Sequence, residues 1–244
     1  MEKIDRLTSL LNRFRLTVRP CAPSVANLVV FEQADEALEL VFQASAPGID
    51  GVGAVLSLAV DVEGGANPLL TALPVCLRMD AGADPEIANL IRLILSELRA
   101  GRCGSPAVLD RLVEILVVRV LRVQLQSGQT TPGLLGGLAH PRVARALVAI
   151  HEDPERAWRN ADLAAEAGLS LSRFKELFQA TVGETPASYL RRWRMTLARR
   201  ELERGERVDR VARRFGYTAP DAFSRAYLRQ FGTRPKQAGL QAAQ

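Results

Sequence analysis

The sequence contains little of what builds disulfide frameworks or metal sites. Three of its 244 residues are cysteine and two are histidine. The cysteines, at positions 21, 76 and 103, are far apart, and no CxxC pair or Cys/His ligand spacing occurs. Neither a structural zinc nor a set of disulfides is therefore expected. We predict that the protein binds no metal and no other cofactor.

Export and membrane insertion are also not indicated. The longest apolar stretch, around 115–125, is interrupted by Arg119 and Arg122 and is shorter than the about 18 residues that a spanning helix needs. Residues 1–16 carry scattered charges and lack the apolar core and cleavage site of a signal peptide. Their apolar residues instead predict an amphipathic helix over 2–16. We expect a cytoplasmic protein that does not bind membranes.

Charge is unevenly distributed along the chain, although the net charge is only +5. From residue 141 onward there are 20 Lys and Arg against 12 Asp and Glu, whereas the preceding residues hold 12 against 15. A mildly acidic front part and a basic rear part indicate that only the rear part meets a polyanion such as a nucleic acid.

The front part predicts an α+β domain. Short segments within about 14–62 are rich in Val, Leu and Phe and are separated by turn residues. This pattern is typical of a small, mostly antiparallel β-sheet of four or five strands. A turn over 63–68 and an apolar connector over 68–79 are expected to follow. Apolar residues at three- and four-residue steps then predict a helical hairpin over about 85–126.

The second helix of this hairpin carries a wide apolar stripe. The stripe can pack on the sheet, or it can form the contact between two copies of the chain, and it is wide enough for both. We predict a contact between two copies, a homodimer. The expected interface residues are Leu109, Leu112, Val113, Leu116, Val117, Val120 and Leu121.

Residues 127–138 are rich in Gly, Ser and Thr, with one Pro, and they predict a flexible linker. The linker is also the clearest domain boundary in the chain. The expected organisation is therefore a regulatory and dimerisation domain over 1–126, the linker over 127–138, and an all-α domain over 139–244.

The rear domain contains one pattern twice. In each copy a small residue precedes a Gly by four positions, and two aromatic residues four positions apart precede a second Gly and a Pro. The two sets are Ala164, Gly168, Phe174, Phe178, Gly183 and Pro186, and Ala212, Gly216, Phe223, Tyr227, Gly232 and Pro235. This is the pattern of a helix-turn-helix unit, where Gly permits a positive φ at the turn. Between the copies, 185–205 predicts one long arginine-rich helix, and Trp158 and Trp193 are expected in the core.

Two such units joined by one helix can place two recognition helices in successive major grooves, about 34 Å apart along the duplex. The segments YLRRWRM, FGYTAPDAFSRAY and FGTRP resemble the DNA-binding domain of the AraC/XylS family of bacterial transcription regulators. LLTALPVCL and GSPAVLDRLVEILVVRVLR are similar to members whose N-terminal domain is a cupin-type barrel followed by dimerising helices. The resemblance implies a reduced cupin-like domain in front of a DNA-binding domain with two helix-turn-helix units.

The resemblance also implies which side chains meet DNA, because exposed residues near the start of each second helix reach base edges in this family. Arg225 is expected to bind a guanine through two hydrogen bonds, and Lys175 to bind a base or a phosphate. Glu176 stands where the family often has Arg, so the first unit is expected to bind more weakly or to read a different sequence. The implied DNA-binding residues are Ser172, Arg173, Lys175, Glu176, Gln179, Arg191, Arg192, Arg194, Pro220, Asp221, Ser224, Arg225 and Arg229.

Three functions are consistent with these features. The first is a sequence-specific transcription regulator that binds double-stranded DNA as a homodimer, with RNA polymerase and a small-molecule effector as further partners. The second is an architectural or antagonist protein that binds DNA without activating transcription. The third is a DNA-targeted enzyme, which would need an activated cysteine. None of the cysteines has a motif around it that would activate a thiol, so we predict no catalytic residues and no enzyme.

Overall fold

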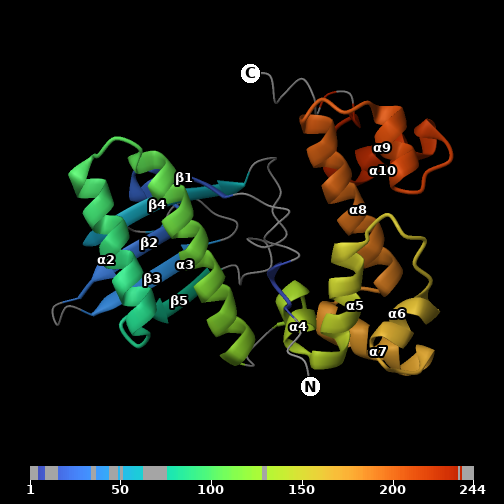
Figure 1. Ribbon diagram of the computed structural model, residues 1–244, viewed down its shortest axis with the longest axis horizontal. Helices are drawn as coiled ribbons and strands as arrows, with labels where there is room; N and C mark the ends of the chain where they lie inside the picture. The colour runs from blue at the N-terminus through green and yellow to red at the C-terminus, as the bar shows by residue number, and fades with distance from the viewer. Residues whose placement is uncertain are drawn as a thin grey trace. The chain divides into compact units, whose positions relative to one another are not determined.

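The structure, a computed structural model, describes residues 5–8, 16–33, 37–43, 49, 52–62, 76–127, 131–235 and 237. The chain divides into two compact units, one spanning Leu11–Thr131 and the other combining Met1–Leu10 with Pro132–Gln244 (Figure 1). Each unit is described by itself. Most of the helix expected over 2–16, and the whole turn expected over 63–68, lie outside the described residues.

The described part of the first unit contains a five-stranded sheet with the spatial order β1-β4-β2-β3-β5. All neighbouring strands are antiparallel. The strands are β1 (Leu16–Pro20), β2 (Leu28–Glu32), β3 (Leu38–Gln43), β4 (Ala54–Val62) and β5 (Cys76–Asp80). The first four match the expected segments. The fifth is a correction, because the end of the expected connector over 68–79 pairs with β3 as an edge strand.

One face of the sheet is apolar because side chains alternate along each strand. The register places Leu28 opposite Phe42 of β3 and opposite Leu58 of β4, and each of the three is at most 2% exposed. Helices α2 (Pro85–Ala100) and α3 (Ser105–Ser127) lie across the sheet as the expected hairpin (Figure 1). The expected α+β architecture of this unit is therefore confirmed.

The apolar stripe of α3 belongs to the core of this unit. Leu112 is half-buried, and the other six residues of the expected dimer interface are at most 4% exposed. These six are Leu109, Val113, Leu116, Val117, Val120 and Leu121. They face inward because the hairpin covers the apolar side of its own sheet, and this corrects their assignment to a surface between two copies. The large apolar side chains that the hairpin exposes are Leu93, Val108 and Ile115, at 52%, 43% and 48%.

The described part of the second unit is all-α. Its helices are α4 (Leu134–Ala139), α5 (Pro141–Glu152), α6 (Asn160–Glu166), α7 (Leu171–Val182), α8 (Pro186–Glu203), α9 (Val208–Arg214) and α10 (Pro220–Phe231). Near the start of the chain, Arg6 donates hydrogen bonds of 3.0 and 3.3 Å to the carbonyl oxygens of Leu138 and Ala139. Arg6 therefore contacts the C-terminal end of α4.

Helix α4 occupies much of the segment expected to be a flexible linker over 127–138. Its three leucines are buried. A Cβ on Gly137 would lie 2.6 Å from a methyl group of Leu147 and 2.7 Å from one of Val182, so only glycine lets α4 approach α5 and α7 this closely. The glycines serve packing here, and the second half of the expected linker is part of the all-α unit. Residues 128–130 lie outside the described part of the chain.

The repeated pattern forms two helix-turn-helix units, α6–α7 and α9–α10, which α8 connects (Figure 1). Gly168 and Gly216 lie at the two turns with φ of 63° and 84°, a conformation that few residues other than glycine adopt without strain. The four aromatic residues of the repeat, Phe174, Phe178, Phe223 and Tyr227, are fully buried. The expected tandem units are confirmed.

Candidate nucleic-acid interface

The outer side of α7 carries the residues that the resemblance assigns to DNA contact in the first helix-turn-helix unit. Phe174 and Phe178 are buried on the inner side, so Ser172, Lys175 and Glu176 lie on the opposite side. The helix begins after Ser170, whose hydroxyl oxygen accepts a hydrogen bond from the Arg173 amide. The core aromatics and the cap together fix the direction in which α7 presents this side.

Three of the implied DNA-binding residues have partners within the first helix-turn-helix unit. An Arg173 Nη lies 3.4 Å from a Glu176 carboxylate oxygen, and both side chains are 64% exposed. Gln179 donates a 2.9 Å hydrogen bond to the carbonyl oxygen of Gly183, just beyond the helix. The ion pair reduces the negative charge that Glu176 presents to a phosphate. Because such exposed pairs contribute at most about 1 kcal/mol, DNA can replace this one at little cost.

Helix α10 presents arginines on its outer side. Phe223 and Tyr227 are buried on the inner side, while Asp221, Arg225 and Arg229 are exposed. Pro220 is the exposed first residue of the helix, and Ser224 is half-buried. Arg225 makes no hydrogen bond or ion pair with any other described residue, so its guanidinium is available to a ligand.

The three arginines that the sequence places together on α8 have different environments. Arg191 is exposed and has no hydrogen bond or ion pair with another described residue. Arg192 donates hydrogen bonds of 2.9 and 2.5 Å to Glu184 and lies over the ring of Tyr189. Arg194 donates from Nε to the Pro154 carbonyl oxygen and from an Nη to that of Arg156, both at 2.7 Å. Arg192 and Arg194 therefore have structural partners, and Arg191 is the member of this set that is free.

The loop over 153–159, between α5 and α6, makes contacts with α8 that sequence reasoning missed. Trp158 is half-buried rather than part of the core, which corrects its assignment, whereas Trp193 is 2% exposed as expected. The indole Nε1 donates to the Asp153 carbonyl oxygen at 2.7 Å, and the Arg156 guanidinium lies 3.9 Å from the centre of the ring. The sequence signal that distinguishes the two is helical spacing. Trp193 belongs to a pattern of apolar residues three or four positions apart, and Trp158 does not.

Tyr217, in the turn before α10, lies in a positively charged region at the junction of the two helix-turn-helix units. Burial raises the pKa of its hydroxyl, and the nearby guanidinium groups of Arg191, Arg194 and Arg229 act in the opposite direction. The phenol is therefore neutral near pH 7 and can donate a hydrogen bond. Burial also lowers the pKa of Arg194, because a partly buried charge loses hydration.

The described residues contain no group of three or more His, Cys, Asp and Glu side chains that could hold a metal ion. No described helix is both long enough and apolar enough to cross a membrane.

Two helix-turn-helix units turn two exposed helix faces outward, and one of these faces carries an arginine that has no partner among the described residues. The arrangement is a tandem helix-turn-helix domain, which can present two helices to successive major grooves of DNA. A family model described as a helix-turn-helix domain matches residues 163–239, and one described as a cupin matches residues 13–126. The second match covers the sheet and hairpin of the first unit, which is therefore cupin-like.

Named relatives agree with these matches. An AraC-like transcription regulator of Streptomyces lividans is 38% identical over 173 residues, which are 68% of this chain and 56% of the relative. The HTH-type transcriptional regulator AlkR of Acinetobacter baylyi is 33% identical over 175 residues, which are 70% of this chain and 57% of the relative. The chain spans a little over half the length of these curated relatives. It belongs to the AraC family of transcription regulators.

Among solved structures, an AraC-type transcriptional regulator from Chromobacterium violaceum is 24% identical. It covers 43% of this chain and 94% of its own, with a TM-score of 0.41. The family assignment rests on the family models and the sequence relatives.

Proposed function

We propose that this protein regulates transcription by sequence-specific binding to double-stranded DNA, with α7 and α10 in two successive major grooves. The observation that carries the proposal is Arg225, an unpaired guanidinium on the outer side of a helix whose inner side is held by Phe223 and Tyr227. An arginine so placed is suited to donate two hydrogen bonds to O6 and N7 of one guanine. The relatives named as transcription regulators support the same function.

Arg225→Ala is expected to relax specificity at one base position, because a bidentate contact to guanine contributes about 1–3 kcal/mol of discrimination. The measurement is the affinity for a site selected from random DNA and for each single-base variant of it. Arg210→Ala is the matched control, since Arg210 lies on α9 of the same unit and is ion-paired with Glu206 at 3.3 Å. Equal weakening on every sequence would instead identify Arg225 as a phosphate contact.

We infer further that the protein is a homodimer and that the outer face of the α2–α3 hairpin forms its interface. Val108 and Ile115 lie two turns apart on one side of α3, and Leu93 is exposed on the neighbouring α2. Exposed large apolar side chains grouped on one face favour burial against another protein surface. The inward-facing stripe of α3, including Val117 and Leu121, already packs on the sheet of the same chain.

The double variant Leu93→Asp/Ile115→Asp is expected to be monomeric in sedimentation velocity and to keep the thermal stability of the unaltered protein, because both positions are exposed. Val52→Asp is the control, since Val52 is 88% exposed but lies in the turn before β4. A sedimentation coefficient that does not change in the double variant would contradict this interface.

A DNA-modifying enzyme is the least supported alternative. Burial raises the pKa of the Cys21 thiol, which is the opposite of what a nucleophilic cysteine needs. Cys76 and Cys103 are exposed and free. We infer that the protein acts by binding rather than by catalysis.

RNA polymerase and a small-molecule effector of the cupin-like unit stay predictions that rest on the family resemblance. A cytoplasmic location stays a prediction from the sequence pattern. An architectural or antagonist role without activation is the alternative at the level of function. Selection from random DNA separates the two, because two defined sequence blocks about one helical turn apart support the regulator and indifference to sequence supports the alternative.

A further inference from the structure

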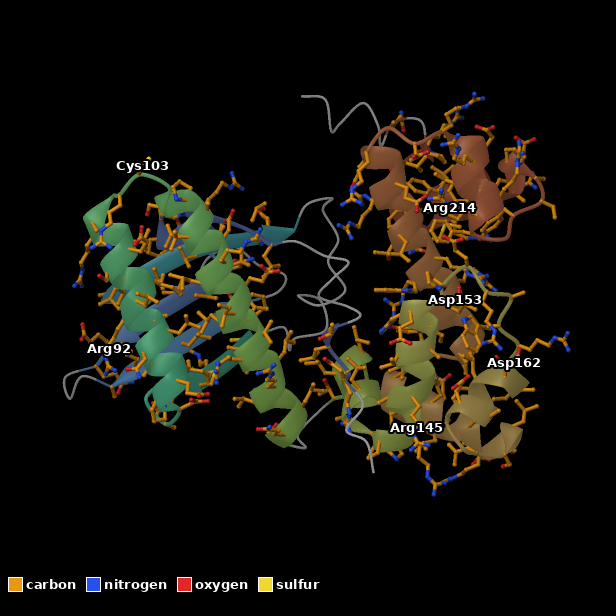
Figure 2. The ribbon with its side chains drawn as sticks, viewed as in Figure 1. Arg92, Cys103, Arg145, Asp153, Asp162 and Arg214 are labelled. Atoms are coloured by element: carbon orange, nitrogen blue, oxygen red, sulfur yellow. The ribbon has the colours of Figure 1, made fainter. Side chains whose placement is uncertain are left out.

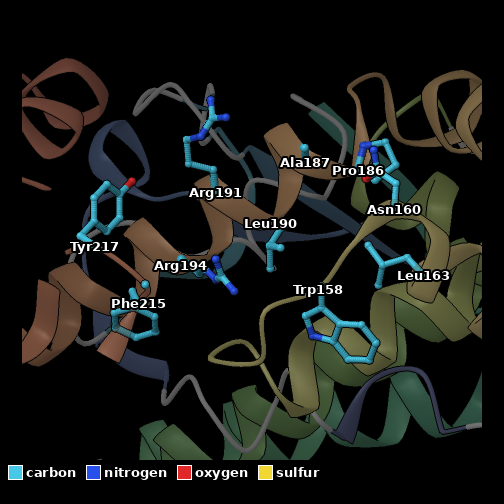
Figure 3. A pocket seen from close by; sticks show the side chains of 11 residues that line it. Trp158, Asn160, Leu163, Pro186, Ala187, Leu190, Arg191, Arg194, Phe215 and Tyr217 are labelled. Atoms are coloured by element: carbon cyan, nitrogen blue, oxygen red, sulfur yellow. The ribbon is translucent and has the colours of Figure 1, made fainter. Parts of the chain in front are cut away.

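A cavity of about 250 Å³ lies between the two helix-turn-helix units, beside α8 (Figure 3). The first helix-turn-helix unit contributes Asn160, and the loop before it contributes Trp158. The turn of the second helix-turn-helix unit contributes Gly216 and Tyr217. One side of α8 closes the cavity with Arg191 and Arg194. The cavity therefore lies at the junction of the two helix-turn-helix units.

The cavity is lined by two arginines and by no carboxylate side chain. Arg194 is held in place by its hydrogen bonds to the carbonyl oxygens of Pro154 and Arg156, with Asp153 as the carboxylate that influences it. Its remaining Nη lies on the side of Gly216, 3.7 Å from where a Cβ of that residue would be. A fixed and partly buried positive charge therefore stands at the wall of the cavity.

Arg191 and Tyr217 add hydrogen-bond donors to this charge. The Tyr217 hydroxyl points from its turn toward the side of the cavity where Arg191 emerges from α8 (Figure 3). The raised pKa of the phenol keeps this donor protonated, and Arg191 has no partner among the described residues. A negatively charged group with several acceptor oxygens fits such donors, because charge-assisted hydrogen bonds are the stronger kind.

We propose that this cavity holds a backbone phosphate of the bound DNA, contacted by Arg191 and Tyr217 within the field of Arg194. The proposal rests on the proposed function. If α7 and α10 occupy successive major grooves about 34 Å apart, the DNA backbone between those grooves must pass the junction at α8. A phosphate there fixes the register of the protein on the duplex and carries no sequence information.

The test neutralises one phosphate at a time with methylphosphonate in the DNA between the two sequence blocks. In the unaltered protein, one or two adjacent replacements are expected to weaken binding about tenfold, the loss of one charge-assisted hydrogen bond. In Arg191→Ala the same replacements are expected to weaken binding much less, because only Tyr217 and the field of Arg194 remain at the phosphate. This variant should also bind all sequences more weakly by one factor and lower the slope of log affinity against log salt by about 0.9.

Arg210→Ala is the matched control, because Arg210 is an exposed arginine on α9 of the second helix-turn-helix unit and is paired with Glu206. It is expected to keep the pattern of the unaltered protein, and Tyr217→Phe is expected to weaken the same phosphate position as Arg191→Ala. The site would be overturned if the effects of Arg191→Ala and of methylphosphonate were additive at every position. A site that binds a free anion rather than DNA would give the same additive result. Failure of the unaltered protein to bind two sequence blocks would overturn the proposed function and this site with it.

Discussion

Replacing Phe178 with alanine is expected to destabilise the DNA-binding unit by about 3–5 kcal/mol, the cost of truncating a buried aromatic residue. Phe178 is fully buried on α7, and its ring lies 5.5 Å from that of Phe174 and 5.9 Å from that of Tyr189 on α8. Tyr189 in turn lies 2.6 Å from Nε2 of the buried His151 on α5. Phe178 therefore packs α7 against α8 through Tyr189, which is in turn hydrogen-bonded to His151 of α5.

The measurement is thermal or denaturant unfolding of the full chain. A loss of this size is a large share of the about 5–15 kcal/mol by which proteins are stable, so DNA binding should fail at temperatures that the unaltered protein tolerates. Leu171→Ala is the control, because Leu171 is on the same helix but 42% exposed, and its truncation should cost no more than about 0.5 kcal/mol. Equal stability of the two variants would show that Phe178 does not hold α7 in place.

The tandem units were predictable because their signals are local. Gly168 and Gly216 precede aromatic pairs at helical spacing, and each turn needs the positive φ that glycine provides. The first four strands of the sheet were predictable for the same reason, because each is a short apolar segment between turn residues. Wherever backbone conformation and the nearest four residues decide the structure, the sequence pattern and the structure agree.

The differences arise where a distant surface decides. The apolar stripe with Val117 and Leu121 predicts that α3 is covered on one side, but periodicity does not distinguish a sheet of the same chain from a second copy. The glycines before Leu138 are typical of a linker, yet Gly137 is required by contact with Leu147 and Val182, which are far along the chain. In both cases the residue type is explained by a partner that the local pattern does not contain.

The arginines of α8 show the same limit for the candidate site. Arg191, Arg192 and Arg194 are alike in the sequence, and the resemblance implies DNA contact for all three. The structure separates them because Glu184 lies eight residues before Arg192, while the Pro154 and Arg156 carbonyl oxygens lie about forty residues before Arg194. Positive charge alone predicts a polyanion as partner, but not which arginine is free to bind it.

Arg194→Met is expected to loosen the junction between the two helix-turn-helix units. Its two hydrogen bonds to the loop over 153–159 involve a charged group, and such bonds contribute about 1.5–3 kcal/mol each. The second helix-turn-helix unit reaches the same loop through Arg214 of α9 (Figure 2). Its Nη1 lies 2.9 Å from a carboxylate oxygen of Glu201 on α8, and its Nε lies 3.8 Å from one of Glu155. Without Arg194, the loop and the first recognition helix are less firmly tied to α8.

The readout is the penalty for changing the spacing between the two DNA sequence blocks by one base pair. A rigid junction fixes the distance between α7 and α10, so the unaltered protein should discriminate strongly against altered spacing, and Arg194→Met should discriminate less. Arg192→Met removes an arginine from the same helix, but this arginine is paired with Glu184 and not with the loop. The variant should therefore keep the original penalty. Lower stability in Arg194→Met with an unchanged spacing penalty would mean that Arg194 stabilises the loop but does not position the recognition helices.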